Sequence, residues 1–527
     1  MSRIKIYDST LRDGAQAQGI SFSVEDKLKI VTRLDKLGIS YIEAGNPGSN
    51  PKDIEFFEKV KNIQLKSAKL AAFGSTRRAG INAEDDANVR SLLKAETPVI
   101  TIFGKAWDFH VLEVLRTTLD ENINMIKDTV RFFKGQGKEV VFDAEHFFDG
   151  YKANPEYALM TLKAAAESGA GCLVLCDTNG GSFPDKISEV TKLVKDRFNQ
   201  VDIGIHCHND TGMADANSIM AVKAGAVQVQ GTINGFGERC GNANLITIIP
   251  NLQYKMGYQC ISEENIAKIT TTARFVSEIA NIMHNERAPY VGNCAFAHKG
   301  GMHIDAVMKS TASFEHIDPS IVGNERRVLM SEVSGRSTIM SAIKEVEPEI
   351  SKDSPEAKRI IDKLKKLEHE GYQFEGAESS FELVIRKELG KYKNFFELEN
   401  FKVIITDPDK DDLSASAMIK VKVGDMDEIT AAEGDGPVNA LDKALRKALE
   451  VFYPELSKMR LTDFKVRVLD SESATAAKVR VWIESTDGEN SWSTVGVSTN
   501  VINASWKALV DSVEYMLIKN GSCKEQK

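Results

Sequence analysis

The stretch Ile203-Gly-Ile-His206-Cys-His208-Asn-Asp210 joins an alternating apolar run to two histidines that stand two positions apart. Alternation of this kind predicts a β-strand, in which residues i and i+2 point to the same side. His206 and His208 are therefore expected to face one place. Because neutral imidazole is the commonest metal ligand, the pair indicates half of a divalent metal site. The alternative is two polar residues at a strand end, and the rest of the chain decides between them.

Composition limits the classes of protein to consider. A chain of 527 residues is too long for one core, so roughly two to four domains are expected. The net charge of −9 argues against a general nucleic-acid surface. Seven scattered cysteines are typical of a reducing compartment, and no apolar run suits a membrane span or a signal peptide. We therefore expect a soluble cytoplasmic protein.

The first 258 residues alternate strand-like and helix-like segments. The helix predicted over Ser23–Lys36 has a capping box of Ser23 and Asp26, and Gly38 follows its end. The expected strands are Ile4–Ser9, Tyr41–Gly45, Leu70–Gly74, Val99–Gly104, Glu139–Phe147, Cys172–Thr178, Ile203–Asp210 and Val227–Asn234. Eight such units in this length predict a (β/α)8 barrel, with a doubly wound open sheet as the alternative.

Reactive residue types follow these strands, where a barrel carries its chemistry. Asp13 follows the first strand and Asn242 the eighth, so both could converge with His206 and His208 on one ion. One carboxylate, two imidazoles and one amide carbonyl suit an exchangeable octahedral site for Mg²⁺, Mn²⁺, Zn²⁺ or Co²⁺. A closed structural zinc site is not expected.

Three separated motifs carry a family resemblance. Asp8–Gln16, His206–Asp210 and Gly235–Leu245 resemble the isopropylmalate/homocitrate/citramalate synthase family. Four longer runs resemble its citramalate synthase branch: Gly48–Asp53, Phe73–Arg78, Phe142–Pro155 and Gly371–Glu378. The likeness covers nearly the whole chain. It implies condensation of pyruvate with acetyl-CoA to give citramalate and CoA, an entry to isoleucine biosynthesis.

The resemblance also implies roles for single residues. It makes Asp13, His206, His208 and Asn242 the metal ligands, and it gives Arg12, Glu145 and Thr178 substrate or catalytic roles. Arg12 would stabilise the developing alkoxide, and Thr178 would hold the pyruvate carboxylate. Glu145 would act in the acid–base network around the acetyl group, and its alternative is a carboxylate paired with a neighbour.

A size-selective pocket is expected because pyruvate must be distinguished from larger 2-oxo acids. Phe103, at the end of the fourth strand, is the predicted wall. Two positions depart from the family pattern. Phe314 stands where the family usually has tyrosine, and Asn46 stands where the branch tends to have tryptophan.

The β/α rhythm stops near residue 259. Helices are predicted over Asn265–Met283, Glu332–Ile343 and Glu356–Glu370, around a loop-rich stretch from Pro289 to Gly323. This part resembles the family's connecting subdomains, which reach across a homodimer. The resemblance places His303 in the partner's barrel as the base for the acetyl methyl proton, and a surface histidine on a mobile loop is the alternative.

The C-terminal part contains an internal repeat. Val438–Leu445 recurs 64 residues later as Ile502–Leu509, and each copy begins a helix that follows strand-like runs. Two βββα units are expected. They resemble the family's allosteric domain, which binds the end-product amino acid, here isoleucine. The helix starts after Gly434–Pro437 and Ser498–Asn500 offer unpaired N–H groups to its carboxylate, and a plain dimerisation module is the alternative.

The predicted domains are a catalytic barrel over 1–258, connecting subdomains over 259–380 and a regulatory domain over 381–519. Isopropylmalate synthase and homocitrate synthase are the alternative activities. A lyase of the same barrel superfamily would lack the C-terminal repeat. A non-catalytic metal-binding amino-acid sensor, suggested by Phe314, is the alternative from another class of function.

Overall fold

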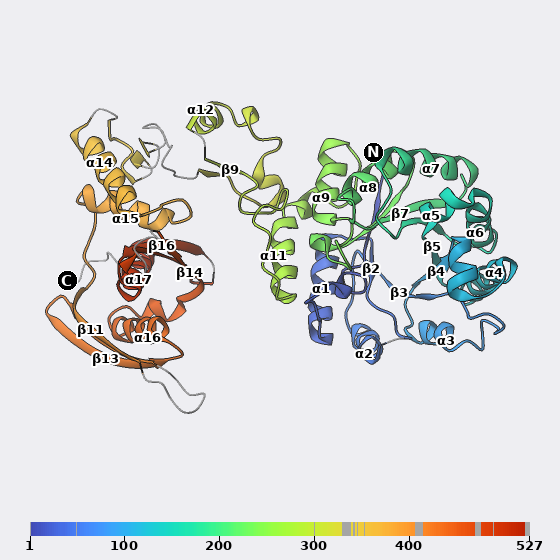
Figure 1. Ribbon diagram of the computed structural model, residues 1–527, viewed down its shortest axis with the longest axis horizontal. Coiled ribbons are helices and arrows are strands. Elements are labelled where there is room, and N and C mark those ends of the chain that lie inside the picture. Colours follow the sequence, from blue (N-terminus) through green and yellow to red (C-terminus); the bar gives the residue numbers. More distant parts are fainter. Residues whose placement is uncertain are drawn as a thin grey trace. The chain divides into compact units, whose positions relative to one another are not determined.

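The computed structural model describes residues 2–48, 50–299, 301–328, 339–340, 343–344, 346–351, 354–405, 415–469, 476–488 and 490–521 (Figure 1). The chain forms two compact units. The first comprises residues 1–296 and 317–326, and the second comprises 297–316 and 327–527. The predicted domain boundaries at residues 258 and 380 remain a prediction, because a division into two compact units does not test a division into three domains.

The first unit is a closed barrel in which β1 to β8 pair in parallel in sequence order, and β8 pairs with β1. The predicted (β/α)8 barrel is therefore confirmed, and the open sheet is excluded. The strands are β1 (Lys5–Asp8), β2 (Tyr41–Glu43), β3 (Lys69–Ser75), β4 (Val99–Lys105), β5 (Glu139–Glu145), β6 (Cys172–Asp177), β7 (Asp202–Cys207) and β8 (Gln228–Gly231).

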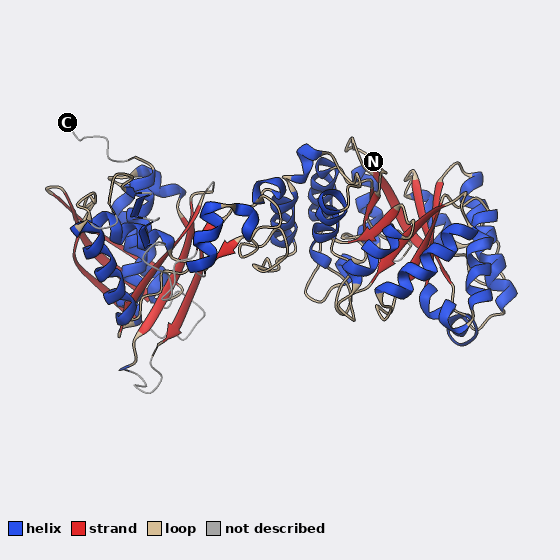
Figure 2. Cartoon of the chain, turned by 90° about the horizontal axis from the view of Figure 1, so that it is seen from above, coloured by secondary structure: helices blue, strands red, loops and turns tan. Residues whose placement is uncertain are grey.

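Helices surround the strands, as Figure 2 shows with helices in blue around red strands. The first has the predicted ends, because the capping box of Ser23 and Asp26 is formed and Gly38 adopts a left-handed conformation after the last turn. The helices are α1 (Val24–Leu37), α2 (Pro51–Val60), α3 (Ala87–Lys94), α4 (Leu119–Gly135), α5 (Phe147–Ala153), α6 (Pro155–Glu167), α7 (Pro184–Arg197), α8 (Ala214–Lys223) and α9 (Leu245–Pro250).

The barrel is filled and is not a pore. Its interior contains a buried cluster of Tyr7, Tyr41, Ala71, Val99, Val141, Cys172, Val174 and Cys176. A second and larger apolar core lies where the strands pack against the surrounding helices. Because the interior is packed, charged side chains on the strands can meet solvent only at the barrel ends.

The segment after the barrel differs from the prediction in two places. The predicted helix Asn265–Met283 is instead α10 (Glu263–Ile266) and α11 (Ile269–Ile279), because residues 267–268 break it. The stretch predicted as loop-rich contains the short strand β9 (Ala297–His298) and the helix α12 (Gly301–Lys309). Most of the predicted helix Glu332–Ile343 lies outside the described residues, and α14 (Pro355–Glu370) matches the third predicted helix.

The C-terminal part consists of the two predicted βββα units, after α15 (Glu378–Glu388). Each has an antiparallel three-stranded sheet and one helix, and the two helices share one apolar core with both sheets. The first contains β11 (Glu397–Ile405), β12 (Ala415–Val423), β13 (Met426–Gly434) and α16 (Pro437–Glu450). The second contains β14 (Arg460–Val468), β15 (Val479–Thr486), β16 (Ser491–Ser498) and α17 (Val501–Lys519). Among the described helices, none is long and apolar enough to cross a membrane.

Candidate metal and substrate site

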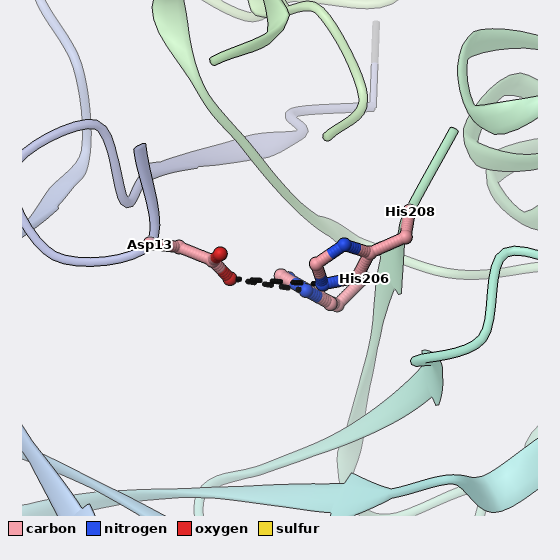
Figure 3. Close-up of side chains that lie close together, drawn as sticks. All are labelled: Asp13, His206 and His208. Carbon is pink, nitrogen blue, oxygen red and sulfur yellow. Dashed lines mark ion pairs between the residues drawn. The ribbon is translucent and has the colours of Figure 1, made fainter. Parts of the chain in front are cut away.

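Asp13, His206 and His208 meet at the carboxyl end of the barrel strands (Figure 3). The loop after β1 carries Asp13, whereas the histidines stand at the end of β7 and just beyond it. The Oδ2 atom of Asp13 lies 3.5 Å from Nε2 of His206 and 3.9 Å from Nε2 of His208. The ligand atoms lie within 4.8 Å of one another, and all three side chains are buried.

The protonation states of these groups suit a metal. Burial lowers the pKa of His206 to about 3 and also lowers that of His208, so both imidazoles are neutral at neutral pH. Burial raises the pKa of Asp13, but the charge of the Arg12 guanidinium outweighs this effect, and the pKa is lowered to about 2. The contacts of Asp13 with the rings are therefore not ion pairs. A carboxylate and two neutral imidazoles face one point.

Backbone pairing with His208 places Asn242 beside these three side chains. Asn242 forms an isolated antiparallel bridge with His208, and its Nδ2 donates to the carbonyl oxygen of Phe236 at 3.1 Å. The Oδ1 atom is thereby left as an acceptor. Gly237 permits the arrangement, because a Cβ there would lie 2.1 Å from Asn242 Nδ2 and its φ of +159° disfavours other residues.

The donor set fits a divalent metal ion. Among the described residues, Oδ1 of Asn242 and Nδ1 of both histidines are buried without a hydrogen-bond partner. Buried polar atoms without partners are rare in folded proteins, and a cation would satisfy the amide oxygen. One carboxylate, two imidazoles and one amide oxygen leave coordination positions for water or substrate.

Arg12 is fixed next to this group by three contacts. Its Nε donates to Oε1 of Glu43 at 2.5 Å, and its Nη1 lies 3.3 Å from Oδ2 of Asp13. The guanidinium carbon lies 3.7 Å above the centre of the Phe73 ring, which is a cation–π contact. Glu43 is fully buried and also accepts a hydrogen bond from the Tyr7 hydroxyl at 2.5 Å.

A cavity of about 280 Å³ opens in front of these residues. It is lined by most of the residues that the sequence predicted, namely Arg12, Asp13, Phe103, Glu145, Thr178, His206 and His208. Phe73 and Phe103 form its apolar side, with ring centres 5.1 Å apart and nearly parallel planes. The cavity therefore combines a charged pole around Asp13 with an aromatic wall.

Glu145 is paired, as the alternative reading of this residue expected. It forms an ion pair with Lys105, the last residue of β4, and both side chains are mostly buried. The two residues are register neighbours on adjacent strands. The carboxylate still lines the cavity, so pairing and contact with substrate are compatible.

Thr178 is held at the edge of the cavity. Its Oγ1 accepts the backbone N–H of His146 at 2.9 Å, and its carbonyl oxygen accepts from Nη2 of Arg239 at 2.8 Å. Arg239 is in turn bound through two nitrogens by Asp210, at 2.8 and 2.9 Å. Among the described residues no hydrogen bond uses the hydroxyl hydrogen of Thr178, so the hydroxyl group can donate to a substrate oxygen.

His303 is not in this cavity within the first unit. It belongs to the second unit, on α12, where it is exposed and its ring stacks on Phe314 at 4.2 Å between centres. Phe314 is the residue that replaces the family's usual tyrosine, so the departure lies against the predicted base. Asn46 lies in the first unit, where its N–H donates to Asp53 at 2.8 Å.

Four residues in or beside the cavity were given no role from the sequence. Glu43 and Asp143 are buried inward-facing carboxylates, and burial raises the pKa of both. Glu43 ends β2 and Asp143 lies two residues before the end of β5, which was a usable signal because Asp13 and Glu145 were found in that way. Phe73 and Lys105 were not identifiable, since an aromatic or a lysine near a strand end is common.

Family models match the chain in three parts. The HMGL-like family model matches residues 3–276, which contain the barrel. A homocitrate synthase post-HMGL domain-like model matches residues 290–372, and the LeuA allosteric (dimerisation) domain matches residues 375–517.

Full-length relatives agree with this arrangement. The (R)-citramalate synthase of Aquifex aeolicus is 55% identical over 98% of this chain and 98% of its own, and that of Geobacter sulfurreducens is 53% identical over 99% and 98%. The 2-isopropylmalate synthase of Pyrococcus furiosus is only 31% identical over 97% of this chain and 98% of its own. The chain therefore belongs to the HMGL-like family and, within it, to the group of the (R)-citramalate synthases.

Proposed function

We propose that this protein condenses pyruvate with acetyl-CoA in a metal-dependent reaction that yields (R)-citramalate and free CoA. The observation that carries the proposal is the convergence of Asp13, His206 and His208 next to the buried Arg12, in a cavity with an aromatic wall. Identity of 45–55% with five (R)-citramalate synthases over nearly the whole chain supports it.

Asp13, His206, His208 and Asn242 would hold the metal ion. When bound, such an ion supplies Lewis-acid polarisation of a carbonyl group and a template for a 2-oxo acid. Mg²⁺, Mn²⁺, Zn²⁺ and Co²⁺ are all compatible with this set of ligands. The chain's own part is to keep both imidazoles neutral and Asp13 ionised, which its burial and Arg12 achieve.

Arg12 is proposed to stabilise the oxyanion that develops on the pyruvate carbonyl. Its Nε is engaged by Glu43 and its Nη1 lies near Asp13, and the side chain lines the cavity. A donor fixed in advance costs no reorganisation when negative charge appears. Thr178 is proposed to donate its hydroxyl hydrogen to the pyruvate carboxylate.

The proton balance assigns two further roles. The acetyl methyl group must lose one proton before its carbon attacks C2 of pyruvate, and the alkoxide that forms must take up one proton. The thioester is then hydrolysed by one water to the carboxylic acid and free CoA. We assign the first proton to His303 of a second subunit, with Glu145 in the same acid–base network. Lys105 holds the Glu145 carboxylate at the cavity, where its oxygens can accept a hydrogen bond from substrate or water.

Selectivity for pyruvate is proposed to come from the aromatic wall. Phe103 stacks on Phe73, so neither ring can turn aside without disturbing the other. A closed pocket discriminates strongly against substrates that are too large to fit. A larger pocket gains only a little binding energy from each added methylene group. 2-Oxoisovalerate, the substrate expected of an isopropylmalate synthase, would need this wall to move.

The test is release of free thiol from acetyl-CoA with a panel of 2-oxo acids. We expect pyruvate to be the best substrate and 2-oxoisovalerate to be poor. His208→Ala should abolish release, and His110→Ala, a histidine outside the catalytic cavity, is the matched control. Faster turnover with 2-oxoisovalerate would favour isopropylmalate synthase. Absence of release with every 2-oxo acid would favour the non-catalytic amino-acid sensor.

The second unit is proposed to bind isoleucine as a feedback inhibitor, in a cytoplasmic homodimer. The match to a LeuA allosteric (dimerisation) domain supports this assignment. Unpaired backbone N–H groups were predicted at the starts of both helices, and the two helices differ in this respect. At α17 the prediction is wrong, because Asn500 caps the N–H groups of Ile502 and Asn503. At α16 the residue before the helix is Gly436, which provides no side-chain cap. The α16 start is therefore the preferred site for the carboxylate.

Exchange of subunits tests the dimer. His303→Ala and Arg12→Ala chains should each be inactive, and mixing them should restore activity if His303 acts in the partner's barrel. Heterodimers that form without any recovery would place His303 in its own barrel or outside catalysis.

A further inference from the structure

A second cavity of the first unit lies at the end of the strands opposite to the catalytic cavity. It measures about 350 Å³ and is formed by the end of α1, the loop before β3 and the start of α11. Ser67 of this cavity precedes β3, and Phe73 of the catalytic cavity lies six residues further along that strand. At about 3.3 Å per residue this is a separation of about 20 Å. The two cavities are therefore separate and share no lining residue.

The lining of this cavity is strongly basic. Arg33, Lys36 and Lys66 line it, and the structure has no ion pair between any of these three side chains and a carboxylate of the described residues. Asp35 also lines the cavity, but its carboxylate accepts the backbone N–H groups of residues 66, 67 and 68 at 2.8–3.0 Å. Lys268 adds a fourth cation, which contacts the Asn265 amide oxygen at 2.7 Å. In a chain with a net charge of −9, such an excess of positive charge is unusual.

Two hydrogen-bond donors of the lining are buried and unused. Nε of Arg33 and Oγ1 of Thr272 have no hydrogen-bond partner in the described part of the chain, and the Thr272 side chain is fully buried. A buried donor without an acceptor is costly, so folded proteins rarely contain one. The guanidinium of Arg33 is supported from the side by the Phe275 ring, 5.5 Å away. Both donors therefore stand ready for an acceptor that enters the cavity.

We propose that this cavity binds an oxyanion of the phosphate class. Such an anion offers several acceptor oxygens, which can take the Arg33 and Thr272 donors while the lysines neutralise its charge. A single phosphate leaves much of a 350 Å³ cavity free, so the anion can be either free phosphate or the phosphate group of a small metabolite. A carboxylate has too few oxygens to engage all four basic side chains and the hydroxyl.

Isothermal titration calorimetry on the full-length protein tests the proposal with three probes: inorganic phosphate, sulfate and adenosine 5′-phosphate. We expect Arg33→Gln to weaken phosphate binding about tenfold or more and Thr272→Val to weaken it severalfold. Lys66→Gln should also weaken it. Lys192→Gln removes an exposed cation of α7, and this matched control should bind as the wild type does. Tighter binding of adenosine 5′-phosphate than of inorganic phosphate would identify a metabolite as the source.

An anion could also enter the catalytic cavity, so Arg12→Gln is the second control. Binding that survives Arg12→Gln and disappears in Arg33→Gln assigns the anion to this cavity. Circular dichroism melts without phosphate show whether each variant is folded. If Arg33→Gln is not, Lys66→Gln carries the test, because an exposed lysine is easily replaced. Absence of binding for all three probes, or equal binding by all the variants, would show a solvated basic surface and overturn the proposal.

Discussion

Glu43 is predicted to support both the stability of the barrel and the position of Arg12. Its carboxylate is fully buried and accepts from Arg12 and from Tyr7, each at 2.5 Å. Glu43→Ala would leave the Arg12 cation with only Asp13, 3.3 Å away, and would also free the Tyr7 hydroxyl. Breaking a buried ion pair on one side costs about 3–5 kcal/mol. Because Asp13 remains, we expect the lower end, about 3 kcal/mol.

The assay must separate the two units of the chain. Trp482, Trp492 and Trp506 lie in the second unit and only Trp107 in the first, so tryptophan fluorescence reports mainly on the second unit. Circular dichroism reports on both. We expect Glu43→Ala to lower the Tm of the barrel transition by at least about 5 °C and to leave the fluorescence transition unchanged.

Catalysis should fall as well, since a guanidinium displaced by about 1 Å can cost about a hundredfold in rate. Glu55→Ala is the matched control, because Glu55 is an exposed carboxylate paired with Lys59 at 3.0 Å. An exposed pair contributes at most about 1 kcal/mol. If Glu43→Ala melts and turns over like the Glu55→Ala control, the buried pair does not hold Arg12, and the reasoning is refuted.

Further predictions concern pH, the acid–base pair, the metal and the effector. Burial raises the pKa of Asp8 to about 7, so between about pH 4 and 7 the folded state keeps a proton that the unfolded state loses. The free energy of unfolding should therefore fall by up to about 4 kcal/mol as pH rises over this range. Denaturant melts should show that Asp8→Asn removes most of this loss. Lys105→Met should reduce thiol release severalfold and Lys105→Arg should restore part of it, because arginine keeps a positive charge beside Glu145; equal rates would contradict the role of the pair. A chelator should abolish turnover without unfolding the barrel, as an unchanged circular dichroism spectrum at room temperature would show, and loss of that spectrum would mean a structural metal. Truncation near Gly390 should remove inhibition by isoleucine, and equal inhibition of both forms would exclude the regulatory assignment.

The barrel could be predicted because its signals are local and repeated. The capping box of Ser23 and Asp26 sets the start of α1, and eight strand–helix alternations set the barrel. His206 and His208 share a side because they are two residues apart in an extended segment. Closure of the barrel then brings Asp13, which follows the first strand, to 3.5 Å from His206 in the seventh strand.

The rest of the site depends on contacts that no local pattern reports. The ion pair of Lys105 with Glu145 requires the register of β4 against β5, and the stacking of Phe73 on Phe103 requires that of β3 against β4. Tertiary pairing, and not residue type, determined these two contacts. The cap by Asn500 is different, because it is a local contact with the N–H groups of Ile502 and Asn503 that a favoured N-cap residue indicates in the sequence.

The most direct test of the central claim is the identity and amount of the product. The full-length protein, with Mg²⁺ or Mn²⁺, is incubated with acetyl-CoA and pyruvate, and CoA and citramalate are quantified by chromatography. We predict one (R)-citramalate for each CoA released, and neither product when His208→Ala replaces the wild type. Release of CoA without citramalate, or an equal yield from the His208→Ala chain, would contradict the claim that Asp13, His206 and His208 hold the metal for this condensation.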